Sequence, residues 1–202
     1  ENAMGIVCEP FRQWVIENSF SAAHPDFAAA GAMLVEDVRP YEEMKLRMLN
    51  GSHSFLAYLG ALAGHETVAD CMADPVFGRA AQMLMLQEQA PTLSVPADVD
   101  LGAYAKALMQ RFSNSRLGHR TQQIAMDAYL RGKSETGEAL SLSDPLAGRL
   151  LEIAGGEDGA AYVDALLGVE AVFPQPLAKD PRFRQAIHEA YRALRGTGVR
   201  AA

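Results

Sequence analysis

From residue 41 onward, apolar side chains recur at spacings of three and four, which is the periodicity of an amphipathic helix. The first such stretch contains Tyr41, Met44, Met48, Leu49, Phe55, Leu56 and Leu59. The run at residues 80–86 is apolar on nearly every side, so it predicts a deeply buried helix. Further helices are expected at about residues 100–112, 115–129, 143–154, 160–172 and 180–194.

The first forty residues show a different pattern. Residues 14–16 combine aromatic and β-branched side chains and predict a strand, and residues 33–35 predict a second short one. The sequence therefore predicts a mainly α fold. Residues 1–40 are expected to form a short β or irregular segment, and residues 41–202 a multi-helical domain.

Composition narrows the classes of function. The chain has 202 residues, with 18 Lys and Arg against 25 Asp and Glu, and its net charge of −7 disfavours a nucleic-acid binder. No window approaches a membrane span, and the N-terminal residues lack the basic and apolar regions of a signal peptide. Cys8 and Cys71 lie far apart, as in a reduced cytoplasmic protein, and no spacing of His, Cys and Asp predicts a metal site.

The residues best suited to chemistry lie in the first long helix. At 100° per residue, Lys45, Asn50 and His53 fall within an arc of about 140°, so a lysine, an amide and an imidazole can converge on one small ligand. Gly51 and Ser52 are poor helix formers in mid-helix. Their small size indicates close approach by a ligand or by another backbone.

This set of side chains suits the oxidation of an alcohol by hydride transfer. A lysine desolvated by apolar neighbours can act as a general base, and an asparagine can donate to a developing alkoxide or carbonyl oxygen. A histidine can hydrogen-bond the same hydroxyl or an adjacent one. The alternative interpretation is structural, because a lysine on an amphipathic helix usually faces solvent and a single helical histidine usually serves packing.

The string Lys45-x4-Asn50-x2-His53 and its surroundings resemble the mannitol dehydrogenase family, the long-chain, metal-independent polyol and sugar-acid dehydrogenases. The resemblance begins with Glu-Pro-Phe-Arg-Gln-Trp-Val-Ile-Glu at residues 9–17 and continues through residues 41–54. It extends over segments at residues 86–93, 111–114, 118–127 and 143–146. It therefore spans most of the chain.

In this family, the lysine that matches Lys45 takes the hydroxyl proton, and the residues that match Asn50 and His53 bind and polarise the reacting oxygen. The family's C-terminal half is helical, and its N-terminal half is a Rossmann-like domain that binds NAD or NADP. The glycine-rich run at residues 155–159 lies between helices, so it is not a dinucleotide-binding fingerprint. The resemblance therefore implies the C-terminal domain of a two-domain dehydrogenase, whose NAD (or NADP) is held mainly by a Rossmann-like domain outside this chain.

The sequence departs from the family pattern after Asp127. There the family continues into a stretch that carries a further active-site lysine, whereas Asp127 is followed at once by Ala128, in a segment that resembles a later position. Several tens of residues therefore have no counterpart, and the chain on its own is expected to be inactive.

Residues 86–93 and 119–121 resemble the fructuronate reductase branch, which implies D-mannonate and D-fructuronate as substrates ahead of D-mannitol and D-fructose. A sugar acid needs a cation for its carboxylate, and arginine offers a bidentate fork, so Arg120 is the candidate, with His119 as a weaker partner. The competing interpretation of Arg120 is a surface ion pair. The competing interpretation of the whole chain is a non-catalytic helical module for substrate binding or oligomerisation.

Overall fold

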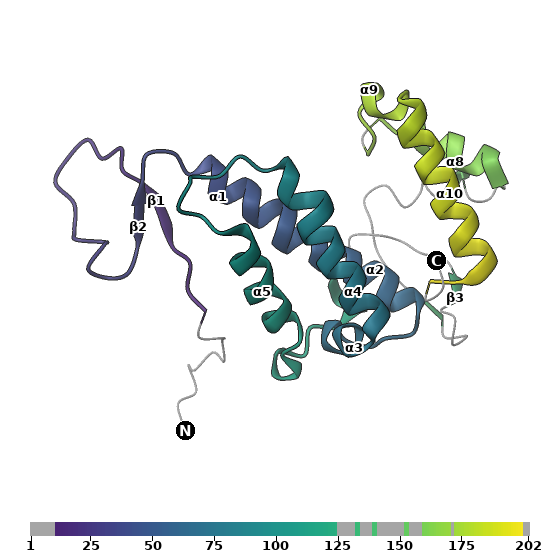
Figure 1. The fold of residues 1–202 in the computed structure, drawn as a ribbon, viewed down its shortest axis with the longest axis horizontal. Helices are drawn as coiled ribbons and strands as arrows, with labels where there is room; N and C mark the ends of the chain where they lie inside the picture. Colours follow the sequence, from purple (N-terminus) through teal and green to yellow (C-terminus); the bar gives the residue numbers. More distant parts are fainter. Residues whose placement is uncertain are drawn as a thin grey trace.

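The computed structural model describes residues 11–124, 132–133, 139–140, 152–153, 159–170 and 172–199. These residues form a mainly α fold, which confirms the predicted fold class. Figure 1 shows a pair of short strands at one end, a group of helices from α1 to α5 in the middle, and α8, α9 and α10 at the other end.

Two three-residue strands lie where the sequence predicts them: β1 (Val15–Glu17) and β2 (Met33–Val35). They run parallel, with Val15 opposite Met33 and Glu17 opposite Val35. Residues 18–32 connect them through turns and bends without a helix.

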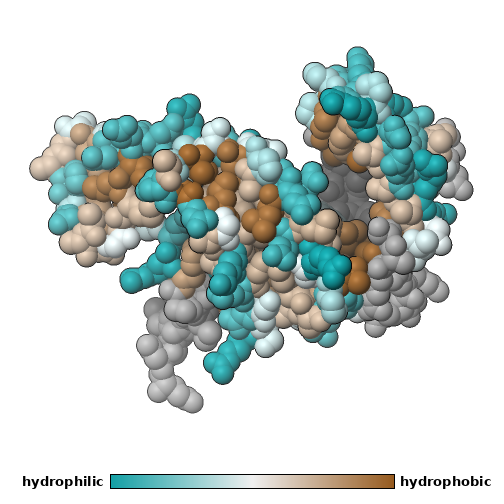
Figure 2. Space-filling view, viewed as in Figure 1, coloured by the Kyte–Doolittle hydropathy of each residue, from teal (hydrophilic) through white to brown (hydrophobic). Residues whose placement is uncertain are grey.

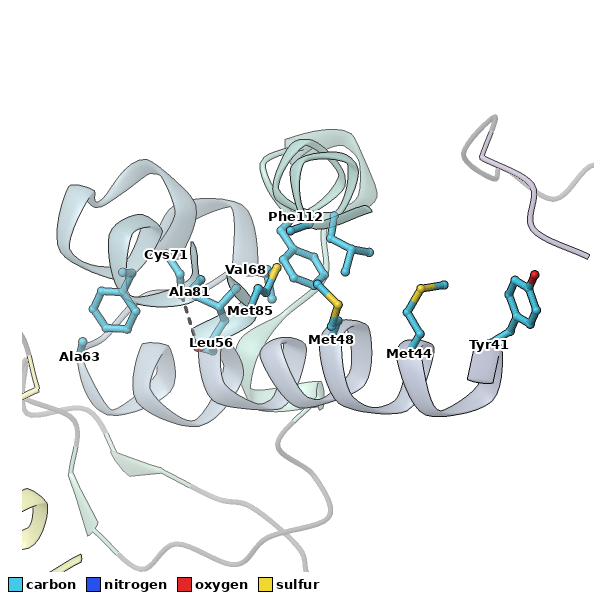
Figure 3. Packing of buried hydrophobic residues seen from close by; sticks show 13 residues of the cluster. Tyr41, Met44, Met48, Leu56, Ala63, Val68, Cys71, Ala81, Met85 and Phe112 are labelled. Carbon is cyan, nitrogen blue, oxygen red and sulfur yellow. Dashed lines mark hydrogen bonds between the residues drawn. The ribbon is translucent and has the colours of Figure 1, made fainter. Parts of the chain in front are cut away.

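One long helical element carries the residues singled out above. It has three consecutive parts, α1 (Arg39–Met44), the π-helix η1 (Lys45–Gly51) and α2 (Ser52–Leu62). Pro40 lies in its first turn, where the missing N–H leaves no bond unmade. Gly64 follows its end with a φ of 82°, a conformation that favours glycine. Figure 3 shows its buried side chains pointing to one side, toward the other helices: Tyr41, Met44, Met48 and Leu56.

Two capped helices cover that side. α3 (Val68–Ala73) begins at a capping box in which the Thr67 and Asp70 side chains each accept a hydrogen bond from the other's backbone N–H. α4 (Pro75–Met83) begins at Asp74, whose carboxylate accepts a hydrogen bond from the second residue of the helix.

The apolar run at residues 80–86 is less buried than the sequence predicts. Ala81 and Met85 are fully buried, but Met83 is 47% exposed and Leu86 39% exposed, because only one side of this helix meets the core. The run crosses from α4 into the π-helix η2 (Leu84–Gln89). The 3₁₀ turn η3 (Ala90–Thr92) follows and, after a connector, α5 (Leu101–Phe112).

The prediction of a single helix at residues 115–129 is wrong over the part that the structure describes. The chain forms a 3₁₀ turn η4 (Ser115–Leu117), then α6 (Thr121–Ile124). Gly118, at a φ of 57°, breaks the helix, and residues 119–121 run beside residues 66–68. There the N–H of the first residue of α3 donates to the carbonyl of residue 119 at 2.9 Å. The remainder, from residue 125, lies outside the described residues.

The last third of the chain holds a second, smaller hydrophobic cluster. A short antiparallel pair, β3 (Gly132–Lys133) and β4 (Ala139–Leu140), comes before this cluster in the sequence. The cluster itself lies among α8 (Gly159–Leu167), α9 (Gln175–Ala178) and α10 (Pro181–Thr197). α8 ends five residues earlier than the expected 172, next to a glycine, and the short α9 was not predicted. The helix expected at 143–154 and the turn at 155–159 fall almost entirely outside the described residues.

The main core lies between the long helical element and α3, α4 and α5. A separate cluster joins α8, α9 and α10. Across it, the Asp164 carboxylate on α8 accepts hydrogen bonds from Arg184 and from His188 Nε2 (3.0 Å) on α10. The two clusters fix the described helices without any contribution from Lys45 or Asn50.

Candidate functional site

Lys45 and Asn50 lie five residues apart in the π-helix η1. A π-helix bonds each N–H to the carbonyl five residues earlier, so residues five apart come closer to one face than they do in an α-helix. The hydrogen bonding of η1 therefore places these two positions nearer to one face than the α-helical spacing behind the arc of about 140° does. The Lys45 side chain is exposed and that of Asn50 is half-buried.

His53 lies two residues beyond η1, in the first turn of α2. Its ring stacks on the Phe112 ring, with the ring centres 5.3 Å apart and the planes at 9°, and it meets His119 edge-on at 5.3 Å. Its Nε2 atom is buried and has no hydrogen-bond partner among the described residues. A buried ring nitrogen left without a partner costs about 1–3 kcal/mol, so the site favours a ligand that supplies one.

The electrostatics keep this imidazole neutral. Burial, together with the smaller effects of the neighbouring His119 and Arg111, lowers the pKa of His53 to about 4. A neutral imidazole carries one N–H donor and one acceptor nitrogen, so it can donate a hydrogen bond to a hydroxyl or accept one from it. His53 is therefore a hydrogen-bonding group at neutral pH and not a cation.

Helix α5 forms the wall behind His53. Phe112 provides the stacking surface, and Arg111 lies over the ring of Phe11 with its guanidinium carbon 4.1 Å from the ring centre. Burial raises the pKa of the Tyr104 hydroxyl, and the Arg111 charge opposes that rise. Arg111 thus acts on Tyr104 within this wall and on His53 in front of it.

The structure separates the two residues proposed to bind a carboxylate. His119 contacts His53, because the backbone pairing of residues 66–68 with 119–121 holds it there. The Arg120 side chain instead donates from Nη2 to Glu66 Oε1 at 2.7 Å, and both side chains are exposed (64% and 70%). This is the surface ion pair that was the competing interpretation of Arg120.

Sequence reasoning missed Gln89, the last residue of η2. Its side-chain Oε1 accepts a hydrogen bond from Ser52 Oγ at 3.0 Å, and Ser52 is fully buried. A Cβ atom added to Gly51 would lie 3.0 Å from Gln89 Nε2. The small residues at 51 and 52 therefore make room for a glutamine side chain of a second π-helix. The close approach expected from the sequence is real, but its partner in this structure is neither a ligand nor a backbone.

Arg47 forms a second link between the same two segments. Its guanidinium donates to the Thr92 carbonyl and, at 3.0 Å, to Thr92 Oγ1, and it also pairs with Glu43 one helical turn away (3.1 Å). Thr92 Oγ1 donates in turn to the Gln89 carbonyl at 2.7 Å. Arg47 therefore pairs with neighbours other than Lys45, Asn50 and His53.

Other features of the described residues lie apart from this constellation. An apolar pocket of about 520 Å³ lies between α2, α4 and the end of α10, and Phe55, Met83 and Leu194 are among the residues that line it, whereas Lys45, Asn50 and His53 are not. No group of three metal-binding side chains occurs within the described ranges. None of the helices there is long and apolar enough to cross a membrane.

Comparison with known proteins defines the class. Residues 37–131 match the family described as "Mannitol dehydrogenase C-terminal domain". The chain is 44% identical to D-mannonate oxidoreductase of Escherichia coli over 96% of its length, and 32% identical to mannitol 2-dehydrogenase of Aspergillus terreus over 98%. Residues 37–131 are therefore identified as a mannitol dehydrogenase C-terminal domain, and the chain as a whole is similar to oxidoreductases of that family.

The solved structures agree with this assignment. The fold matches a Pseudomonas fluorescens mannitol 2-dehydrogenase, solved as a ternary complex with NAD and D-mannitol, with a TM-score of 0.84 and 30% identity over 95% of this chain. A D-sorbitol dehydrogenase matches with a TM-score of 0.79 at 24% identity, which supports the fold alone.

The chain spans about half the length of the relatives it matches, 47% of both the D-mannonate oxidoreductase and the mannitol 2-dehydrogenase. The alignment with the D-mannonate oxidoreductase is 229 positions long, more than the 202 residues of this chain. That relative therefore has residues without a counterpart here. The step from Asp127 to Ala128, at which such a difference was expected, lies outside the described residues.

Proposed function

We propose that this chain is the helical, substrate-binding half of an NAD-dependent oxidoreductase that interconverts a sugar acid or sugar alcohol with its keto sugar. D-Mannonate and D-fructuronate are the favoured pair, followed by D-mannitol and D-fructose. The observation that carries the proposal is the buried, unpartnered Nε2 of a neutral His53 beside the turn that holds Lys45 and Asn50.

Each of the three side chains has a role in this reaction. Lys45 Nζ accepts the proton of the reacting hydroxyl as the C–H hydride leaves. The Asn50 amide donates to the oxygen, which gains negative charge as the proton departs. His53 Nε2 pairs with the same or an adjacent hydroxyl of the substrate, which removes the cost of its burial.

The cofactor supplies the oxidant, since NAD accepts the hydride. The described residues contain no strand followed by a glycine-rich turn and a helix, which is the arrangement that cradles a dinucleotide. The described residues fit the binding of the substrate instead. We therefore assign cofactor binding to the N-terminal half of the full-length protein, where the choice between NAD and NADP is also made.

The exposure of Lys45 bears on the proposal. A general base works near neutral pH when its surroundings disfavour the charged ammonium, and the Lys45 side chain is exposed in this chain. Bound substrate and the N-terminal half would supply them. The 202 residues alone should therefore have no useful turnover.

The sugar acid is preferred because identity to the D-mannonate oxidoreductase, at 44%, exceeds that to the mannitol 2-dehydrogenase, at 32%. Arg120 and His119 are the candidates for the carboxylate. Arg120 already holds Glu66 through one nitrogen, and its planar fork has further N–H donors.

We also propose a cytoplasmic location, since Cys71 is a free, buried thiol, as expected in a reducing compartment.

The test is a substrate panel on the full-length protein, with NAD(P)H absorbance followed for D-mannonate, D-altronate, D-mannitol and D-arabinitol. Turnover of a sugar acid supports the proposal in full. Turnover of mannitol alone would remove the carboxylate argument and keep the three catalytic residues. No turnover from a full-length chain would favour the competing function, a helical module that binds substrate or oligomerises without catalysis.

A further inference from the structure

Phe112, the last residue of α5, connects the main core to the candidate site. Its side chain is 7% exposed and belongs to the buried cluster that Figure 3 shows between α5 and the long helical element. The same ring stacks on the imidazole of His53, with the planes at 9°. Phe112 is part of the Arg-Phe-Ser-Asn segment of the family resemblance, to which the reaction proposed above gives no part. The stack nevertheless links it to a residue that is proposed to bind the substrate.

A second ring limits the movement of the same imidazole. His119 meets His53 edge-on, with 5.3 Å between the ring centres and 66° between the planes. A parallel stack restricts the tilt of a ring, and an edge contact restricts its displacement within that plane. His53 is therefore restrained in two directions, by Phe112 and by His119.

The chain between these two rings forms a short, defined turn. Only six residues separate Phe112 from His119. The Asn114 side chain accepts a hydrogen bond from the N–H of Arg116 at 3.1 Å, which caps the 3₁₀ turn η4. Gly118 then takes a φ of 57°, at which glycine has no steric penalty. The turn brings the chain back to the same imidazole, so one short stretch supplies both rings.

Hydrogen bonds hold the second ring in place. The N–H of Val68 donates to the carbonyl of His119 at 2.9 Å. Two residues later, the hydroxyl of Thr121 donates to the carbonyl of His65 at 2.7 Å, and Thr121 is fully buried. A buried hydroxyl without a partner is unfavourable, so this bond favours one position for the segment. His119 is thus tied to the residues at the start of α3.

These restraints account for the unpartnered Nε2 of His53. A buried ring nitrogen gains free energy by turning toward a polar group, and Nε2 has no hydrogen-bond partner among the described residues. The rings of Phe112 and His119 oppose such a turn. They therefore keep Nε2 available to a hydroxyl of the substrate.

The same packing keeps charge off the imidazole. Burial is the largest cause of the low pKa of His53, and the charges of His119 and Arg111 act in the same direction. A stacked aromatic ring supplies part of that burial, because it excludes water from the face that it covers. A side chain without a flat ring would cover less of that face.

We propose, on the basis of the proposed function, that Phe112 is a positioning residue whose ring, together with that of His119, holds the His53 imidazole in the orientation in which Nε2 meets the substrate. Phe112 acts through His53 and makes no bond to the reacting atoms. Its loss should therefore slow the chemical step more than it weakens the binding of the substrate.

Kinetics of the full-length protein with D-mannonate and NAD test this role. Phe112→Leu keeps an apolar side chain but removes the flat ring, so kcat should fall by about tenfold or more while KM stays within about threefold. Phe112→Tyr keeps the ring and should restore most of kcat. Phe112→Leu with the wild-type kcat would overturn the proposal, and so would an equal loss of kcat in Phe112→Tyr.

Phe77→Leu is the matched control. Phe77 is 3% exposed, and its ring meets a different histidine, His65, edge-on at 5.0 Å. It lines the apolar pocket outside the candidate site, and Figure 2 shows hydrophobic residues gathered where α2 and α4 meet the end of α10. Both substitutions remove core packing, but Phe77→Leu should leave kcat within about threefold. Equal losses of kcat in Phe77→Leu and Phe112→Leu would overturn the positioning role.

Titration of the His53 ring by NMR tests the packing without any turnover. Phe112→Leu should move the pKa of His53 from about 4 toward its ordinary value of 6.5, whereas Phe112→Tyr and Phe77→Leu should keep it low. An unchanged pKa of His53 in Phe112→Leu would overturn the proposal. If the pKa moves as expected and no substrate of the panel is turned over, Phe112 positions His53 and the proposed function fails.

Thr121→Val tests the second ring, and it does so even if Phe112→Leu does not fold. It removes the hydroxyl that donates to His65 and keeps the branched shape of the side chain. We expect kcat to fall by about threefold or more, and to recover in Thr121→Ser, which keeps the hydroxyl. A wild-type kcat in Thr121→Val would overturn the proposal.

Discussion

Ser52 Oγ donates a hydrogen bond to Gln89 Oε1 at 3.0 Å, and this bond joins the first residue of α2, directly after the π-helix η1, to the end of the π-helix η2. Ser52 is fully buried, and the backbone at Gly51 lies against the same glutamine amide. The glutamine therefore supports the turn that carries Lys45 and Asn50 from the side of the core.

Gln89→Ala should both destabilise the protein and slow the reaction. Loss of the acceptor leaves the buried Ser52 hydroxyl unpaired, which costs about 1–3 kcal/mol. If η1 then shifts, kcat should fall by about tenfold to a hundredfold while KM changes less, because geometry matters most in the transition state. Gln89→Glu, which keeps an acceptor, should recover much of kcat. Gln87→Ala, at an exposed position of the same π-helix, is the control. A kcat for Gln89→Ala equal to that of the control would exclude the supporting role.

Gly60→Ala should be strongly destabilising. A Cβ atom there would lie 2.3 Å from Cys71 Sγ, so a backbone or side chain must move, at a cost of about 1–3 kcal/mol or more. Gly196→Ala in α10, where nothing lies within 4 Å of the added Cβ, should instead stabilise by about 0.5–1 kcal/mol. Urea unfolding of both variants measures the contrast. Unfolding of Gly60→Ala at the wild-type urea midpoint would contradict this close contact. An equal loss of stability when Cys71→Ala is added to Gly60→Ala would contradict it as well.

His53 should titrate far below an ordinary histidine. Its pKa of about 4 in the folded protein lies below 6.5, the ordinary value taken for the unfolded chain. Between those values the unfolded chain binds more protons, so His53 makes the free energy of unfolding fall as the pH drops from 6.5 toward 4. NMR titration of the ring should show the shift, and His53→Gln should weaken the pH dependence of unfolding across that window. A His53 that titrates near 6.5 would contradict its burial against Phe112.

Arg120 should decide between a sugar acid and a neutral polyol if it binds the carboxylate. Arg120→Gln should then raise KM for D-mannonate by about tenfold or more and leave KM for D-mannitol unchanged, since a hydrogen bond to a charged group contributes about 1.5–3 kcal/mol. Glu66→Gln frees the guanidinium and should lower KM for D-mannonate. Arg116→Gln, a nearby exposed cation, controls for net charge. Unchanged KM in both Arg120→Gln and Glu66→Gln would leave Arg120 as the surface ion pair alone.

Much of the fold follows from local signals in the sequence. Asp74, Asp100 and Asp180 each begin a helix because an aspartate can accept from the first free N–H groups, a property readable from a few residues. The break at Gly118 could not be read in this way. It depends on pairing of residues 119–121 with residues 66–68, and that contact crosses more than fifty positions.

The candidate site, like the fold, could be predicted only where its residues lie close together in the sequence. Lys45, Asn50 and His53 stand close together in the chain, so their spacing and the family resemblance were enough to select them. Gln89 lies 37 residues from Ser52, and η1 is a π-helix packed against a second one, so neither could be found from local periodicity. The small residues at 51 and 52 were the one local signal of that contact. They indicated close approach and could not name the partner.

The central claim is that Lys45 takes the hydroxyl proton, and the most direct measurement is the rate of the chemical step in the full-length protein with Lys45→Ala. We expect that rate with D-mannonate and NAD to fall by a factor of about 10² or more, with substrate binding largely kept. Lys106→Ala, an exposed lysine on α5, should have no effect. A Lys45→Ala protein that reduces NAD at nearly the wild-type rate would contradict the account.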